Sequence, residues 1–142
     1  MVHALSEIRR ILTVDGIMID LRPMLYSWHV EVVSGPRIRE TGRVQDLAAG
    51  IADDEAANRS ITRAEQKGWF IREAEDFFLF IYSWDTPREM EEWIETEWDG
   101  FLQLQNEAKQ ATRSAWATAD ADARVQVKVK MLISRWKVSK EL

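Results

Sequence analysis

One stretch decides how the rest of the chain is interpreted: Glu7-Ile8-Arg9-Arg10-Ile11-Leu12-Thr13-Val14-Asp15-Gly16-Ile17-Met18-Ile19-Asp20-Leu21-Arg22-Pro23. Apolar residues recur at helical spacing up to residue 12, which predicts an amphipathic helix. Asp15-Gly16 then predicts a tight turn. The apolar run Ile17–Leu21 predicts a strand covered on both faces, as in a parallel sheet. Pro23 ends this strand, because proline cannot donate to a strand ladder.

The segment that follows predicts a pair of strands and then a helix. Residues 24–33 and 38–44 flank the turn signal Ser34-Gly35-Pro36, which indicates a hairpin or a long excursion. Residues 53–68 begin with acidic side chains and end in a glycine, which predicts a helix. Few of its positions are apolar, so we expect this helix to lie on the surface.

The region 69–84 is rich in aromatic side chains and predicts either one bulged strand or two short ones. Thr86-Pro87-Arg88-Glu89 is the clearest helix start in the chain. Thr86 can cap, proline suits the first helical position, and Glu89 can complete a capping box. Gly100 interrupts or bends this helix, and a second helical stretch is expected at about residues 103–121.

The C-terminal segment 124–138 alternates between apolar and polar residues, which predicts a strand with one solvated face. The expected apolar face carries Val125, Val127, Val129, Met131 and Ile133, and the expected solvated face carries Gln126, Lys128, Lys130 and Ser134.

Length and composition narrow the class of protein. The chain has 142 residues, which favours one domain spanning residues 1–142. It has no cysteine, so a disulfide framework, a thiolate zinc site and a cysteine nucleophile are excluded. The formal net charge of −5 argues against general nucleic-acid binding. No apolar run is long enough for a transmembrane helix and no signal peptide is recognised, so the expected location is cytoplasmic, with no membrane partner.

The opening segment resembles part of a known enzyme family. Ala4–Leu12, followed by Asp15-Gly16 and the Ile17–Leu21 strand, resembles the EIxRVLKPGG helix, turn and strand of class I S-adenosylmethionine-dependent methyltransferases. The resemblance implies that this strand is the fifth of a seven-stranded sheet. The strands near 69–84 and 125–138 would then be the sixth and seventh, which close the sheet as an antiparallel pair. The expected fold is α/β (or α+β), with a mixed, partly antiparallel sheet and helices.

The cofactor-binding half of that family has no counterpart in the sequence. The family holds its cofactor in a glycine-rich loop after the first strand, where only glycine lets the backbone approach closely. The first four strands are not found, and no Gly-x-Gly occurs, since the six glycines are Gly16, Gly35, Gly42, Gly50, Gly68 and Gly100. We therefore expect no cofactor on this chain alone; S-adenosylmethionine would bind only if another half completed the fold.

The segment from Asp20 to His29 is the best candidate ligand pocket, because it follows the C-terminal end of a strand, where α/β sheets place ligands. Its candidate residues are Asp20, Arg22, Tyr26, Trp28 and His29. The resemblance places this region near the methyl acceptor. The alternative is structural: Tyr26 and Trp28 pack in the core, while Asp20 and Arg22 pair locally.

Other charged groups favour structural roles. The acids of the 89–99 helix are expected to form its solvated face, and they could offer an internal or intersubunit partner to the lysines near the C-terminus. The basic residues of 124–140 beside Trp136 could bind single-stranded nucleic acid, but the solvated face of an edge strand is favoured. His3 and His29 lie on different elements, so no metal site is expected. No residue is assigned as catalytic.

Two functions remain. The favoured one is a methyltransferase-like module that is non-catalytic alone and acts in dimerisation, interaction or small-ligand binding. We expect a homodimer through the edge of the Ile17–Leu21 strand, since an unpaired apolar strand tends to pair. The alternative is the acceptor-binding part of an active S-adenosylmethionine-dependent methyltransferase whose cofactor half lies elsewhere, so whether the protein is an enzyme stays open. A small α+β ligand-binding barrel is a third interpretation, which the fully apolar strand fits less well.

Overall fold

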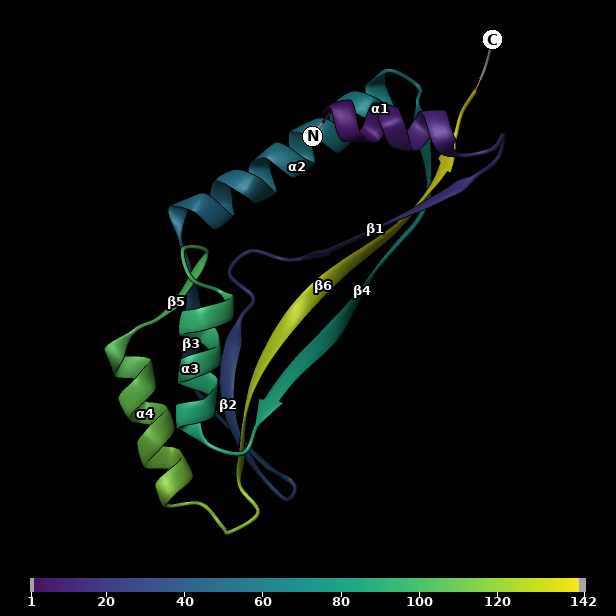
Figure 1. Cartoon of the computed structure of the whole chain (residues 1–142). Helices are drawn as coiled ribbons and strands as arrows, with labels where there is room; N and C mark the ends of the chain where they lie inside the picture. Colours follow the sequence, from purple (N-terminus) through teal and green to yellow (C-terminus); the bar gives the residue numbers. More distant parts are fainter. Residues whose placement is uncertain (1, 141–142) are drawn as a thin grey trace. The chain divides into compact units, whose positions relative to one another are not determined.

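A computed structural model describes residues 2–140 (Figure 1). Within this range the chain forms four helices and six strands. In chain order these are α1 (Val2–Ile11), β1 (Ile17–Pro23), β2 (His29–Ser34), β3 (Arg37–Asp46), α2 (Ala48–Gln66), β4 (Phe70–Trp84), α3 (Pro87–Glu97), β5 (Leu102–Leu104), α4 (Asn106–Ala117) and β6 (Arg124–Val138).

The six strands form one antiparallel sheet in the order β1-β6-β2-β3-β5, and β4 also pairs with β6. The predicted combination of helices with a sheet is confirmed at this level. The strands expected near 69–84 and 125–138 do pair with each other. The direction of β1 follows from two hydrogen bonds: the Val138 N–H donates to the Gly16 carbonyl at 2.8 Å, and the Met24 N–H donates to the Lys130 carbonyl at 2.8 Å. As the residue number rises from 16 to 24 along β1, the residue number of its partner in β6 falls from 138 to 130, so β1 runs antiparallel to β6.

The chain divides into two compact units. The first contains residues 1–22, 52–78 and 131–142, and the second contains residues 23–51 and 79–130. In the first unit, α1 and α2 supply apolar side chains to a core that they share with β4 and β6. The buried members of this core are Leu5, Ala64, Phe70, Trp136 and Val138.

The prediction that β1 is covered on both faces in a parallel sheet is wrong. Met18 packs against the core of the first unit, but Ile17, Ile19 and Leu21 are between 38% and 55% exposed. The strand is antiparallel to β6, which is its one strand partner within residues 2–140. Both helices of this unit contribute to the core on the Met18 side, so alternate residues of β1 remain in contact with water.

The second unit is built on the predicted hairpin. β2 and β3 pair antiparallel from Ser34 opposite Arg37 to His29 opposite Arg43, with an irregularity between Val30 and Glu31. β2 also pairs antiparallel with β6. The segment expected to continue as a helix from residue 103 is instead the short strand β5, which pairs with β3, and α4 begins only at residue 106.

The two longest strands lie where the sequence predicted them, but the buried face of β6 differs from the prediction. β4 is a single strand of 15 residues, and β6 spans residues 124–138 as expected. Val125, Val127 and Val129 are fully buried, but Ser134, Trp136 and Val138 are buried further along. Ser134 therefore does not lie on a solvated face as predicted. The buried positions change from odd to even because Trp136 and Val138 pack in the core of the first unit.

Candidate functional site

The five residues of the predicted pocket are divided between the two units. Asp20 and Arg22 belong to the first unit, and Tyr26, Trp28 and His29 belong to the second. Arg22 pairs with Asp20 at 3.0 Å and donates to the Asn58 side-chain oxygen on α2 at 2.7 Å. The local pairing considered for Asp20 and Arg22 is therefore present, and it joins β1 to α2 inside the first unit.

Trp28 is a core residue of the second unit. It is 7% exposed, and its ring lies 5.1 Å from the Trp98 ring and 6.5 Å from the Tyr82 ring. Tyr82 and Trp98 also contact each other edge to face at 5.0 Å. Such ring pairs stabilise a core beyond their buried area. These contacts support the alternative that Trp28 packs in the core and does not line a ligand pocket.

His29 makes a polar contact from β2 to β3, and Glu31 of the same strand makes polar contacts to β6. The His29 Nδ1 lies 2.7 Å from a Glu40 carboxylate oxygen. Also on β2, the buried Glu31 carboxylate accepts hydrogen bonds from two side chains of β6, Gln126 at 2.9 Å and Lys128 at 3.1 Å. The hydrogen bond from His29 is the main cause that lowers the pKa of Glu40 below its usual value. These contacts tie β2, β3 and β6 together.

Tyr26 is a predicted pocket residue that lines a cavity. Its side chain is exposed, and its backbone has a positive φ of 62°. Its N–H donates to the Asp46 carboxylate at 2.8 Å, which holds this uncommon conformation. Asp46 belongs to β3, so the segment after Pro23 is fixed against the hairpin.

The cavity beside Tyr26 is a groove of about 580 Å³ between β3 and α4. This volume is in the range of small-molecule sites. Arg43 and Asp46 line it from β3, and Gln105 and Glu107 line it from the start of α4. The walls can therefore offer charged and amide groups to a polar small molecule. Only Tyr26 among these residues was indicated by sequence reasoning, because the other walls meet through the packing of α4 on β3.

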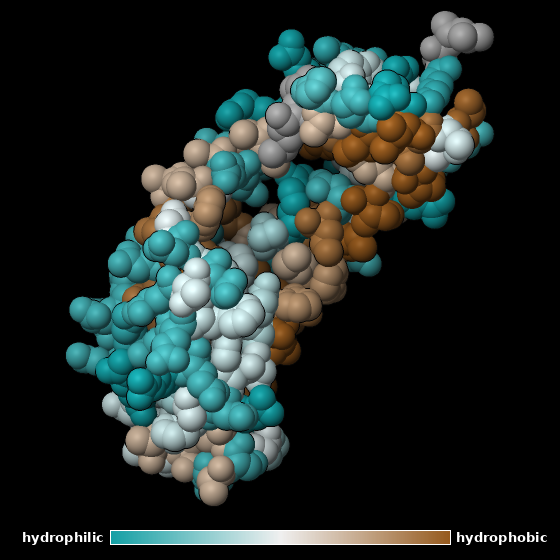
Figure 2. Space-filling model, viewed as in Figure 1, coloured by the Kyte–Doolittle hydropathy of each residue, from teal (hydrophilic) through white to brown (hydrophobic). Residues whose placement is uncertain are grey.

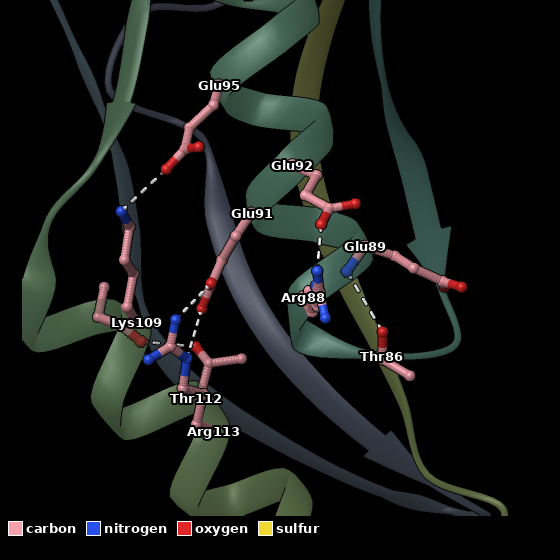
Figure 3. Close-up of polar contacts among 10 residues, drawn as sticks. Thr86, Arg88, Glu89, Glu91, Glu92, Glu95, Lys109, Thr112 and Arg113 are labelled. Atoms are coloured by element: carbon pink, nitrogen blue, oxygen red, sulfur yellow. Dashed lines mark hydrogen bonds and ion pairs between the residues drawn. The ribbon is translucent and has the colours of Figure 1, made fainter.

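Three acidic residues of α3 form ion pairs within the second unit: Glu91, Glu92 and Glu95 (Figure 3). The buried Glu91 accepts two hydrogen bonds from Arg113 of α4, at 2.8 and 2.6 Å. This contact raises the pKa of Arg113. Glu95 pairs with Lys109 at 3.3 Å. These two acids thus join α3 to α4. The sequence had suggested an internal pairing with the lysines near the C-terminus, but within the chain their partners are Lys109 and Arg113 of α4.

Four basic residues of β6 are paired with acids. Their ion pairs are Arg124–Asp85, Lys128–Glu31, Arg135–Glu73 and Lys137–Asp15. The hydrogen bond that Lys137 donates to the Asp15 carboxylate is the main cause that raises the pKa of Lys137. Trp136 is buried, so its ring is not available for stacking on a base. The prediction that these residues lie on an edge strand is wrong, because β6 pairs with β1, β2 and β4. Their ion pairs join β6 to neighbouring segments.

Two strands expose apolar side chains that a single-domain core would normally cover. On β1 these are Ile17, Ile19 and Leu21. On β4 they include five consecutive residues, Phe77, Phe78, Leu79, Phe80 and Ile81. In Figure 2, hydrophobic surface gathers over the region that β1 occupies in Figure 1. The sequence indicated the β1 surface through the expected free edge, but it did not indicate the β4 surface.

Other kinds of site receive no support from residues 2–140. This part of the chain has no group of three or more side chains able to hold a metal ion. None of its helices combines the length and the apolar character needed to cross a bilayer. No protein-family model matches the chain, and neither a curated protein nor a solved structure matches it. The resemblance to methyltransferases therefore stays a prediction.

Proposed function

We propose that this chain is an interaction module that associates with a second copy of itself through β1. The observation that carries the proposal is the exposed row Ile17, Ile19 and Leu21 on a strand that, among the described strands, pairs on one edge only. Unpaired edges with apolar side chains bind other strands unless charges, proline or a covering element prevent it. The methyltransferase-like origin is retained as a proposal, supported by the pairing of β4 with β6.

The sequence of β1 suits antiparallel pairing with itself. An alignment centred on Ile19 places Ile19 opposite its own copy and Ile17 opposite Leu21, so the exposed apolar side chains meet on one face. Pro23, which has no N–H to donate, then lies beyond the apolar row. Asp20 and Arg22 neutralise each other within the chain at 3.0 Å, so like charges do not oppose the contact.

Cysteine trapping tests this proposal. The chain has no cysteine, so a single introduced thiol is a clean reporter. In this alignment the two copies of residue 19 are about 5.5 Å apart at Cα, which a disulfide can bridge. We expect Ile19→Cys to form a covalent dimer under mild oxidation.

The matched control is Ile17→Cys on the same strand. In this alignment the two copies of residue 17 lie roughly 13 Å apart, which is too far for a disulfide. Mixing Ile17→Cys with Leu21→Cys chains should restore the cross-link. Equal cross-linking of Ile19→Cys and Ile17→Cys, or none in either variant and in the mixture, would exclude the proposed pairing.

The second candidate function is the acceptor-binding part of an S-adenosylmethionine-dependent methyltransferase. The groove lined by Tyr26 favours it, because that residue lies in the segment that the resemblance places near the acceptor. Titration calorimetry of the purified chain with S-adenosylmethionine tests whether a cofactor site exists. Micromolar binding would support the enzyme hypothesis and would contradict the expectation that this chain has no cofactor-binding loop.

A further inference from the structure

The groove between β3 and α4 combines small apolar residues with an exposed aromatic side chain. Gly42, Ala108 and Ala111 line it, together with Tyr26, which is 62% exposed. The groove volume of about 580 Å³ is large enough for a small organic molecule. All the residues that line it belong to the second unit, so binding there depends neither on association through β1 nor on S-adenosylmethionine.

β3 directs the Asp46 carboxylate to the side of the sheet on which α4 lies. Side chains alternate along a strand, so residues 42, 44 and 46 share one face. This face is the α4 side, because a Cβ added at Gly42 would lie 2.8 Å from the Ala108 Cβ. The Asp46 carboxylate accepts a hydrogen bond from the Tyr26 N–H at 2.8 Å, so this acid lies next to the aromatic residue of the groove.

Among the described residues, the two acids that line the groove have no basic partner. Glu107 lies in the first turn of α4, and neither Glu107 nor Asp46 forms an ion pair within residues 2–140. Arg43 also borders the groove, but its Nε is 4.0 Å from the Glu40 carboxylate, which His29 contacts as well. Residues 43 and 46 face opposite sides of the strand, so the Arg43 side chain points away from Asp46. The groove therefore favours a positively charged occupant.

We propose that this groove binds a small organic amine in its protonated form. The ammonium group donates charge-assisted hydrogen bonds to the Asp46 and Glu107 carboxylates. The ring of Tyr26 attracts the same cation through its face. Gly42 and Ala108 contact the hydrocarbon part of the ligand. An anionic ligand is disfavoured, because it would be repelled by the two carboxylates.

Three probes of similar shape separate the effect of charge from that of size: phenethylamine is a cation, phenethyl alcohol is neutral and hydrocinnamate is an anion. Two-dimensional NMR follows their binding through the backbone amides of Tyr26, Gly42 and Ala108. We expect phenethylamine to shift these amides with a Kd of about 1 mM or lower, and the alcohol to bind at least about tenfold more weakly. Hydrocinnamate should bind more weakly than the alcohol. Equal affinities of the amine and the alcohol, or no shift of these amides at about 10 mM amine, would overturn the proposal.

Two substitutions of the same kind test the assigned carboxylate. Glu107→Gln keeps the shape of the side chain but removes its charge, and should weaken phenethylamine binding by about three- to tenfold. The matched control Glu92→Gln removes the same charge from α3, outside the groove, and should change the Kd by less than about twofold. Neither substitution should change the affinity for phenethyl alcohol. If Glu107→Gln weakens amine binding no more than Glu92→Gln does, the proposal is wrong.

Discussion

Gly42 shows how a single residue fixes the second unit. A Cβ added at this position would lie 2.8 Å from the Ala108 Cβ, which is closer than side-chain carbons approach. Beside it, the Thr41 and Thr112 hydroxyls are 2.7 Å apart, and Thr112 also donates to the Ala108 carbonyl at 2.7 Å. α4 therefore lies directly on β3, and this contact forms the floor of the groove beside Tyr26.

We expect Gly42→Ala to lower the free energy of unfolding by about 1–3 kcal/mol, because the new methyl group forces α4 away from β3. Urea unfolding measures the loss. Ala108→Gly costs about 1 kcal/mol by itself as a helix glycine, but it should recover part of the loss in the double variant. Additive losses in the double-mutant cycle would show that the clash is not the cause.

Glu40 should contribute a pH-dependent stability through His29. The hydrogen bond from His29 lowers the folded-state pKa of Glu40 below 4.5, the value for an unperturbed glutamate. The stabilisation is therefore present above pH 4.5 and is lost as the pH falls through the lowered pKa. Thermal melting from pH 6 to about 3 should show wild type above Glu40→Gln at the upper end, with the difference shrinking in acid. A constant difference across this range would contradict the assignment.

Several residue-scale features could be predicted because they depend on sequence neighbours. Thr86 caps α3 by accepting from the Glu89 N–H at 3.2 Å, and Pro87 occupies the first helical position, as expected. The Glu89 carboxylate returns to the Asp85 N–H at 3.1 Å, one residue before the cap, so the predicted capping box is shifted. The role of Gly42 could not be predicted, because Ala108 is distant in sequence.

At the scale of elements, α3 combines two ion pairs of different environment (Figure 3). Glu91 is buried and forms two hydrogen bonds with Arg113. Glu92 pairs with Arg88 four residues earlier at 2.9 Å, with both side chains largely exposed. A buried carboxylate depends on its hydrogen bonds much more than an exposed one does.

We therefore expect Glu91→Gln to lower the melting temperature by roughly 3–8 °C. The matched variant Glu92→Gln makes the same chemical change on the same helix and should shift it by less than about 2 °C. Differential scanning calorimetry compares the two. Equal shifts would mean that the contact between Glu91 and Arg113 does not join α3 to α4 in solution.

Element boundaries were predictable where a pattern is long and local. The alternation of residues 124–138 predicted both ends of β6 correctly. β5 was missed because three residues carry too little pattern, and its conformation depends on pairing with β3. The buried positions of β6 change from odd to even residue numbers along the strand. The alternation could not predict this change, because it depends on the side chains that pack against β6 within each unit. The same reason explains the wrong prediction for β1.

At the scale of the whole molecule, the chain leaves apolar strand residues exposed in β1 and β4. Monomeric soluble proteins seldom expose such surfaces without a partner. The sequence led to the expectation of a free edge at Ile17–Leu21, and the sheet order agrees in placing β1 at one end. The five residues of the predicted pocket belong to two units, so a pocket formed by all five stays a prediction. Tyr26 of that set lines the groove between β3 and α4.

The most direct test of the β1 contact is amide hydrogen exchange measured by NMR at several protein concentrations. In an antiparallel pair the N–H groups alternate between the two edges. The bonds at Gly16 and Met24 direct the even-numbered residues of β1 toward β6, so the N–H groups of Ile17, Ile19 and Leu21 point to the free edge. We predict that these three amides exchange rapidly in dilute protein and become protected as the concentration rises. Rapid exchange of all three at every concentration would contradict self-association through β1.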